Sequence, residues 1–148
     1  MRAQIDGKIR TTLFGTPLVW VVLAVVLAWA LAGCSATGAD YPKELSPQQV
    51  KTELANGAML LDVRELDEYS QSHIAGSLWI PLGELSSRLQ GLPRDRLIIV
   101  VCRTSVRSAQ GRDILLESGF SKVTSLSGGL QAWIAAGFPM VSGQPSNP

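Results

Sequence analysis

The stretch LIIVVCRTSVRSAQ, residues Leu97 to Gln110, changes abruptly from apolar to polar at a cysteine. The run Leu97–Val101 is short, apolar and uninterrupted, and it is the strongest strand signal in the chain. A cysteine that only packs as a small hydrophobe would lie inside such a run. Cys102 instead ends it, and two arginines and two hydroxyl side chains follow within five residues. The sequence therefore places this thiol where a buried strand meets solvent.

Short apolar runs alternate with helical patterns along most of the chain. A capping box at Ser46 begins the first expected helix, and Asn56–Gly57 ends it. Leucines recur at three and four residue spacing between residues 82 and 92, which predicts an amphipathic helix there. The expected strands are 59–63, 78–81, 97–101 and 123–126, the expected helices are 47–55, 82–92, 108–117 and 130–136, and 64–77 holds one helical turn at best. This alternation predicts an α/β domain with an open, mostly parallel sheet and helices on both faces.

The first 33 residues have the features of an export signal. Three basic residues precede Leu18–Ala32, an uncharged apolar run shorter than the ~20 residues of a typical membrane span. Leu31 to Cys34 resembles a bacterial lipobox, which implies that Cys34 becomes the lipidated first residue of the mature protein. An uncleaved signal anchor over residues 13–31 is the alternative. Either way, the sequence predicts that the protein body lies outside the cytoplasm.

The rest of the chain divides into a tether, one domain and a tail. Residues 34–44 are small and polar enough for a tether, residues 45–140 hold the α/β pattern, and residues 141–148 are expected to be a flexible tail. Ser35, rather than Asp, follows the lipobox cysteine. If the host is Gram-negative, this resemblance implies a lipid anchor in the outer membrane that leaves the domain facing the periplasm.

Charge and cysteine content exclude some partners. Removing residues 1–33 takes three basic and one acidic residue from totals of 13 and 12, which leaves ten against eleven. A net charge near −1 argues against nucleic acid as a partner, because binding it requires a basic face. With Cys34 lipidated, Cys102 has no partner for an internal disulfide. One histidine and one free cysteine cannot build a metal site, so we expect no metal.

The segment after the cysteine can stabilise an anion. Ligands of open α/β sheets bind at the carboxyl ends of the strands, and Cys102 lies at that place. If residues 103–107 curl into the following helix, their backbone N–H groups form an anion-binding nest. Arg103 and Arg107 add positive charge. These features favour the thiolate form of Cys102 and predict a nucleophile.

Several short motifs together resemble those of the single-domain rhodaneses. They are Leu61-Asp62-Val63-Arg64, Glu68-Tyr69, His73-Ile74-Ala75-Gly76-Ser77, Ile80-Pro81, Val101-Cys102-Arg103, Arg107-Ser108, Gly128-Gly129-Leu130 and Ala132-Trp133. The resemblance implies a rhodanese-like fold and a sulfurtransferase that carries sulfur as a persulfide on Cys102. It also implies that residues 103 to 107, namely Arg103, Thr104, Ser105, Val106 and Arg107, bind a small anionic donor such as thiosulfate. No dissociable cofactor is needed, and the acceptor is cyanide or an unidentified thiol.

Two other functions use the same thiol. A non-catalytic persulfide carrier or thiol redox sensor also needs an accessible thiolate, so the sequence leaves this alternative open. Phosphatases and arsenate reductases on the same fold have five residues between cysteine and arginine, whereas four residues separate Cys102 from Arg107. The shorter loop favours sulfur over a larger tetrahedral oxyanion.

Other conspicuous residues are interpreted as structural. His73 is expected to stabilise a turn, and Asp62 with Arg64 to form a structural ion pair or hydrogen bonds at the end of a strand. Gly128–Gly129 predicts a turn with positive φ that could bring the backbone close to the cysteine. Val106 is expected to anchor the segment after the cysteine to the core. Two tryptophans are also expected in the core: Trp79 and Trp133.

Overall fold

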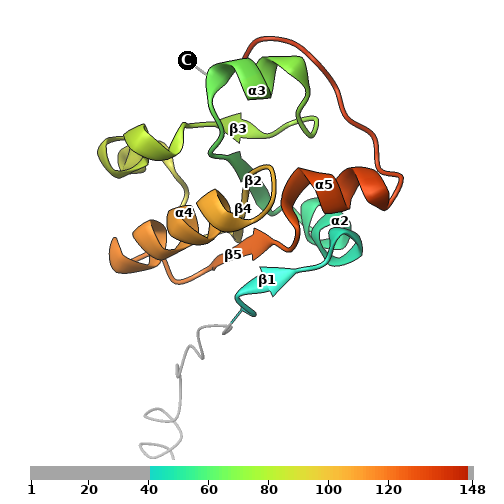
Figure 1. The fold of residues 1–148 in the computed structure, drawn as a ribbon. Coiled ribbons are helices and arrows are strands. Elements are labelled where there is room, and N and C mark those ends of the chain that lie inside the picture. Colours follow the sequence, from blue (N-terminus) through green and yellow to red (C-terminus); the bar gives the residue numbers. More distant parts are fainter. Residues whose placement is uncertain (1–40, 147–148) are drawn as a thin grey trace, which may run out of the picture. The chain divides into compact units, whose positions relative to one another are not determined.

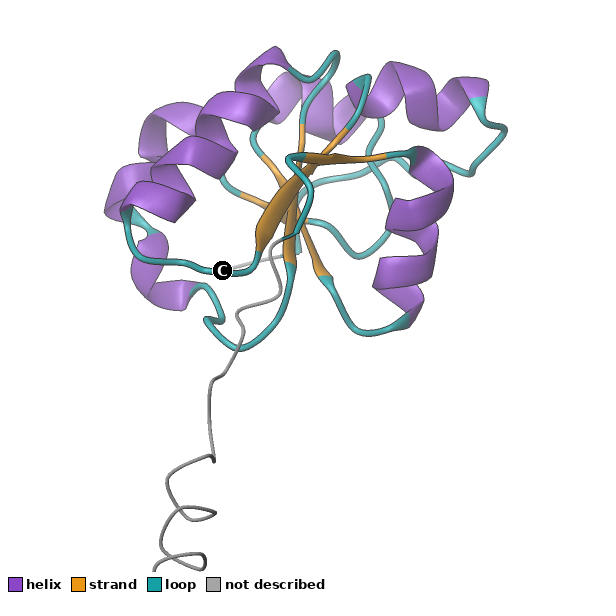
Figure 2. Ribbon diagram, turned by 90° about the horizontal axis from the view of Figure 1, so that it is seen from below, coloured by secondary structure: helices purple, strands orange, loops and turns teal. Residues whose placement is uncertain are grey.

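In the computed structural model, residues 41–146 are described, and within them five parallel strands form one sheet in the order β1-β5-β4-β2-β3 (Figure 1). The strands are β1 (Glu44–Leu45), β2 (Met59–Asp62), β3 (Leu78–Trp79), β4 (Ile98–Val101) and β5 (Val123–Leu126). The α-helices are α2 (Pro47–Ala55), α3 (Leu66–Gln71), α4 (Val106–Glu117) and α5 (Gly129–Ala135). Helices lie on both sides of the sheet (Figure 2), which confirms the predicted fold class.

The strand predicted from the apolar run is present as the central strand β4, and it is buried on both faces. Ile98 and Val100 pack into one hydrophobic cluster, and Ile99 and Val101 pack into another on the opposite face. Each of these four side chains is fully buried. Because side chains alternate along a strand, one uninterrupted apolar run supplies both cores.

Each face of the sheet has its own set of helices. On one face, Leu115 of α4 and Leu85 pack against the sheet residues Leu61 and Val100. On the other face, Val50 of α2 and the α5 residues Leu130 and Trp133 complete the second cluster. The capping box predicted for α2 is present, because the Ser46 hydroxyl accepts from Gln49 N–H and the Gln49 side chain accepts from Ser46 N–H. Burial of Trp133 is also as predicted.

The prediction of one amphipathic helix over residues 82–92 is wrong. Two short 3₁₀ helices, η1 (Leu82–Ser87) and η2 (Leu89–Gly91), replace it and are joined at Arg88. A 3₁₀ helix has three residues per turn, so its geometry also accommodates the three-residue spacing of Leu82 and Leu85. Glycine and serine between the leucines have low α-helix propensity, so an α-helix is not favoured over a 3₁₀ helix in this segment.

The ordered domain is longer at both ends than the boundaries expected at residues 45 and 140. Glu44 and Leu45 form β1, a strand that the pattern does not reveal, and Pro42 C=O accepts a hydrogen bond from Thr124. At the other end, the backbone of Val141 exchanges two hydrogen bonds with His73, at 2.8 and 2.9 Å. Residues 141–143 are therefore part of the domain. Cys34 and the expected signal segment 1–33 lie outside the described residues.

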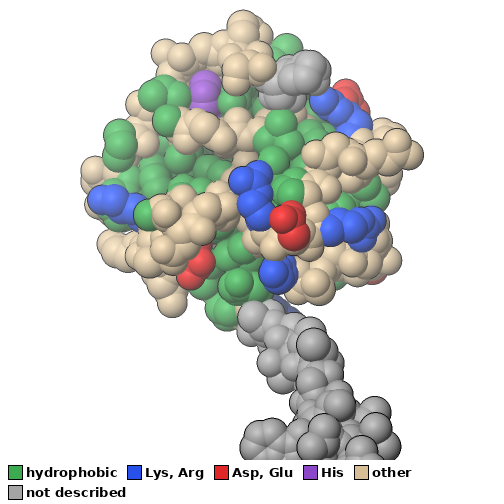
Figure 3. All heavy atoms as spheres, turned by 180° about the vertical axis from the view of Figure 1, so that it is seen from behind, with side chains coloured by type: hydrophobic (Ala, Val, Ile, Leu, Met, Phe, Trp, Pro, Cys, Tyr) green, Lys and Arg blue, Asp and Glu red, His purple; other side chains and the backbone are tan. Residues whose placement is uncertain are grey.

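Two observations describe the helices and one face of the domain. Within residues 41–146, no helix combines the length and apolar character needed to cross a bilayer. On the face shown in Figure 3, basic and acidic side chains are interspersed among apolar and other residues, without a continuous basic stripe.

The packing of α4 gives a test of the fold. Leu115 is fully buried in the cluster around β4, so Leu115→Ala should lower the free energy of unfolding by about 3 kcal/mol. Its neighbour Leu116 is 45% exposed, and Leu116→Ala should cost less than about 0.5 kcal/mol. Urea unfolding of both variants measures the difference. Equal losses would contradict the burial of Leu115 and the exposure of Leu116.

Candidate functional site

Cys102 lies directly after β4, at the edge of the sheet where the parallel strands end. The end of β2 lies beside it, because Asp62, the last residue of β2, pairs with Val101, the residue before Cys102. Cys102 is 1% exposed and belongs to the same hydrophobic cluster as Leu61 and Val100. The thiol is therefore at the predicted end of the strand, but below the surface of the domain.

Three hydrogen bonds fold the chain around the sulfur. Ser105 N–H donates to Cys102 Sγ at 3.2 Å, and Sγ donates to Ser108 Oγ at 3.5 Å. Ser108 Oγ in turn donates to Ser105 C=O at 2.9 Å. The cysteine loop, Arg103–Ser105, is closed by Ser105 in the left-handed region with φ 93°, which among residues 41–146 is the only positive φ outside glycine. Such a conformation costs energy and persists because its surroundings hold it.

The start of α5 fixes the orientation of the loop peptides. Leu130 N–H donates to Cys102 C=O at 2.9 Å, and Gln131 N–H donates to Arg103 C=O at 3.2 Å. In a trans peptide the N–H points opposite to the C=O, so the N–H groups of Arg103 and Thr104 point away from α5. Gly129 permits this contact, because a Cβ on it would lie 2.5 Å from Cys102 C=O. The close approach expected for Gly128–Gly129 is confirmed.

Arg107 is held by a carboxylate from another element. Its guanidinium makes two hydrogen bonds to Glu68 of α3, at 2.6 and 2.8 Å. These hydrogen bonds lower the pKa of Glu68, and the same contact raises the pKa of Arg107. Part of the positive charge of Arg107 is thus compensated within the protein by Glu68.

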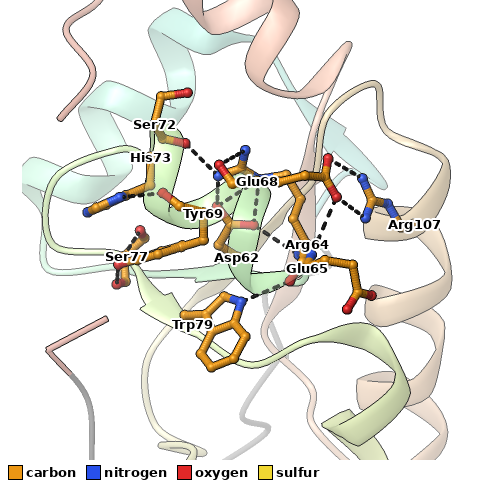
Figure 4. A network of polar contacts seen from close by, with 10 residues as sticks. All are labelled: Asp62, Arg64, Glu65, Glu68, Tyr69, Ser72, His73, Ser77, Trp79 and Arg107. Atoms are coloured by element: carbon orange, nitrogen blue, oxygen red, sulfur yellow. Dashed lines mark hydrogen bonds and ion pairs between the residues drawn. The ribbon is translucent and has the colours of Figure 1, made fainter. Parts of the chain in front are cut away.

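A buried ion pair supports the helix that carries Glu68. Arg64 bonds the Asp62 carboxylate through Nε and Nη2, and its guanidinium also donates to the carbonyls of Glu68 and Ser72 (Figure 4). Asp62 is fully buried and Arg64 nearly so. The predicted ion pair is confirmed, and it connects the end of β2 to the middle of α3 at Glu68 and to its C-cap at Ser72. Trp79, only partly buried, donates from Nε1 to Arg64 C=O at 2.8 Å.

The remaining predicted site residues are on the surface. Arg103 and Thr104 are exposed, and among the described residues Arg103 has no ion pair. Val106 is 67% exposed, so the expectation that it anchors the segment to the core is wrong. The reason is that α4 begins at Val106 rather than at residue 108, which turns this side chain outward. A cavity of about 310 Å³ lies beside Arg103, between α3 residues such as Gln71 and α5 residues such as Ile134.

His73 has structural contacts, as expected. Its ring stacks on Tyr69 with the centroids 3.9 Å apart, and its Nδ1 lies 2.9 Å from Tyr69 C=O. Among residues 41–146, no group of three or more His, Cys, Asp or Glu side chains could hold a metal ion.

Three residues of the site have roles that the sequence does not reveal directly. Glu68 is 39 positions from its partner Arg107, and no local pattern connects them. Ser108 is visible only as a hydroxyl in the first turn of the predicted helix. The strained position of Ser105 has no sequence signal, because the residue there is not glycine.

Residues 46–136 match the model of the rhodanese-like domain, and the chain belongs to this family. A sulfurtransferase of Allochromatium vinosum is 31% identical over 67% of this chain and 94% of its own length. The thiosulfate sulfurtransferase GlpE of Ectopseudomonas mendocina is 34% identical over 70% of this chain and 94% of its own. The crystal structure of a rhodanese-related protein from Thermoplasma volcanium has a TM-score of 0.63 and 31% identity, covering 68% of this chain and 98% of that one.

The Glu68–Arg107 pair should make stability depend on pH. Because the folded-state pKa of Glu68 is lowered, its stabilising effect is present above the ordinary pKa of glutamate and is lost as pH falls through the folded value. The free energy of unfolding of the wild type should exceed that of Glu68→Gln near neutral pH, and the difference should shrink toward pH ~3.

Urea unfolding of the wild type and Glu68→Gln at several pH values checks this expectation. Glu84→Gln is the control, since Glu84 is more exposed and forms a looser pair with Arg88, at 3.3 Å. Its pH-dependent difference should be smaller. A Glu68→Gln difference that stays constant with pH would contradict the role of this carboxylate.

Proposed function

We propose that the protein is a sulfurtransferase that moves a sulfane sulfur from thiosulfate or a persulfide to a thiophilic acceptor. The carrier of that sulfur is a persulfide on Cys102. The observation that carries the proposal is the hydrogen bond from Ser105 N–H to Cys102 Sγ, in a loop at the carboxyl end of a buried strand. The relatives named sulfurtransferase and thiosulfate sulfurtransferase support it.

The first half-reaction loads the cysteine. The Cys102 thiolate attacks the outer sulfur of thiosulfate and forms a new S–S bond. The S–S bond of thiosulfate breaks, its electron pair leaves with sulfite, and the outer sulfur of the persulfide retains one negative charge. The exposed Arg103 supplies positive charge for the approaching dianion, while Arg107, which Glu68 already compensates, contributes less.

The second half-reaction restores the thiolate. Cyanide attacks the outer sulfur, the S–S bond breaks toward Cys102, and thiocyanate leaves. A thiol acceptor follows the same course and releases one proton as it becomes a persulfide. Each half-reaction ends with a sulfur anion in the loop, so the same N–H groups stabilise both the loaded and the unloaded enzyme.

The burial of Cys102 fits a small reacting group. At 1% exposure, the thiol is sheltered from bulky oxidants, whereas thiosulfate needs to bring only one terminal sulfur into the loop. The four-residue separation between Cys102 and Arg107 also favours sulfur over a phosphate or arsenate ion. Cys102-dependent hydrolysis of an aryl phosphate would count against this choice.

Intact mass after incubation with thiosulfate tests the persulfide. The full chain should gain about 32 Da, the mass of one sulfur atom, and lose it again when cyanide is added. Cys102→Ala should show no gain and no thiocyanate production. Cys34→Ala is the matched control and should load sulfur like the wild type.

The kinetics then separate an enzyme from a carrier. Steady thiocyanate production with ping-pong kinetics supports the enzyme. A chain that loads one sulfur and never passes it to cyanide or to a small thiol supports the non-catalytic carrier instead. Failure to gain mass at Cys102 would overturn both.

We also propose that the domain is attached to a membrane, in a Gram-negative host the outer one, through a lipid on Cys34. The support is the uncharged run Leu18–Ala32 followed by the lipobox-like Leu31 to Cys34. Several acyl chains would give a stable anchor, since each buried methylene contributes about 0.8 kcal/mol. The domain then works at a membrane surface outside the cytoplasm.

Metabolic labelling with a fatty acid tests the anchor. The wild type and Cys102→Ala should incorporate the label and lose residues 1–33, and Cys34→Ala should do neither. If the protein is membrane-bound but unlabelled and retains residues 1–33, its anchor is an uncleaved signal segment and not a lipid.

A further inference from the structure

Ser108 is a fully buried polar residue in the first turn of α4, beside the reacting sulfur. Its hydroxyl has two partners, Cys102 Sγ at 3.5 Å and Ser105 C=O at 2.9 Å. One side chain thus contacts the nucleophile and also holds the carbonyl of the strained residue that closes the loop. The other end of α4 offers no equivalent, because the hydroxyl of the C-cap residue Ser118 bonds the carbonyl of Ile114 and no sulfur.

The hydroxyl can reverse its direction when the sulfur ionises. With a neutral thiol, S–H donates to Ser108 Oγ, and the Ser108 hydroxyl donates to Ser105 C=O. A thiolate has no proton to give and accepts hydrogen bonds only. Rotation about the Ser108 C–O bond then directs the hydroxyl hydrogen to Sγ.

This rotation leaves no buried group without a partner. Ser105 C=O also accepts from Ala109 N–H at 2.9 Å, and it keeps that bond when the hydroxyl turns away. Sγ would then accept from Ser105 N–H and from Ser108 O–H together. Hydrogen bonds to a charged group are stronger than those between neutral groups, so this arrangement favours the ionised sulfur.

We propose that Ser108 is a further residue of the reaction centre, whose hydroxyl donates to the ionised sulfur of Cys102. The inference rests on the proposed function for its catalytic meaning, but the hydrogen bond itself can be tested without turnover. The negative charge returns to Cys102 Sγ whenever the outer sulfur is transferred. Ser108 is therefore expected to speed both loading and release.

The charged groups around the sulfur stay the same when Ser108 is changed. Arg103 in the loop and Arg107 in α4 are positively charged, and the acidic residues are Glu68 of α3 and Glu65, the N-cap of that helix. The Asp62–Arg64 pair ends β2, and the first residues of α5 carry no charge. A change in ionisation on substituting Ser108 thus reports the hydroxyl rather than another ion pair.

The test compares Ser108→Ala with the matched control Ser118→Ala in a Cys34→Ala background. Thiolate formation is followed by its ultraviolet absorbance against pH, with Cys102→Ala as the blank. For Ser108→Ala, the midpoint should move to higher pH by about one unit, and sulfur loading from thiosulfate near neutral pH should slow about tenfold. Ser118→Ala should change neither quantity. Ser108→Thr, which retains a hydroxyl, should restore both in part.

The outcomes separate this inference from the proposed function. An unchanged midpoint in Ser108→Ala, or the same shift in Ser118→Ala, overturns the role of Ser108 even if the wild type transfers sulfur. The role of Ser108 is also overturned if Ser108→Thr and Ser108→Ala are both stably folded and change the midpoint and the loading rate equally. A third outcome is that the midpoint shifts in Ser108→Ala while the wild type takes no sulfur from thiosulfate. That result supports the hydrogen bond from Ser108 and overturns only the proposed function.

Discussion

The geometry of the site depends on the contact between the start of α5 and the loop after β4. The N–H groups of Leu130 and Gln131 hold the carbonyls of Cys102 and Arg103, and Gly129 has no Cβ to separate the two segments. This contact requires β4 and β5 to be neighbours, which their parallel pairing provides. Once the carbonyls are held by α5, the polarity of the loop is determined: acceptors face the helix and donors face away from it. An anionic sulfur is stable only in a loop of that polarity.

The sequence predicts the parts of the fold that burial dictates. The run Leu97–Val101 must lie in the middle of the sheet because no other place buries both of its faces, and Cys102 follows at its end. Prediction fails where local energies are nearly balanced. A two-residue strand such as Glu44–Leu45 has too few side chains for a pattern, and leucine spacing alone does not distinguish η1 and η2 from one α-helix.

The candidate site is predictable in its residues but not in its charge. From the sequence, Arg103 and Arg107 are two equivalent cations near a thiol. In the structure only Arg103 lacks an ion pair among the described residues, because Glu68 comes from a separate helix to hold Arg107. Such long-range pairing depends on the tertiary fold and has no local signal. The Asp62–Arg64 pair, only two residues apart, could be anticipated for the opposite reason.

The attachment of residues 141–143 bears on how the protein can be handled. Val141 and Gly143 are bonded to His73 and Ser70, so the end of the domain is attached beside the helix that carries Glu68. An affinity tag or fluorescent fusion joined shortly after Gly143 would begin within a few residues of that attachment. It would therefore need a long linker to keep its bulk off the site, while shortening the chain before Val141 would detach one support of that helix.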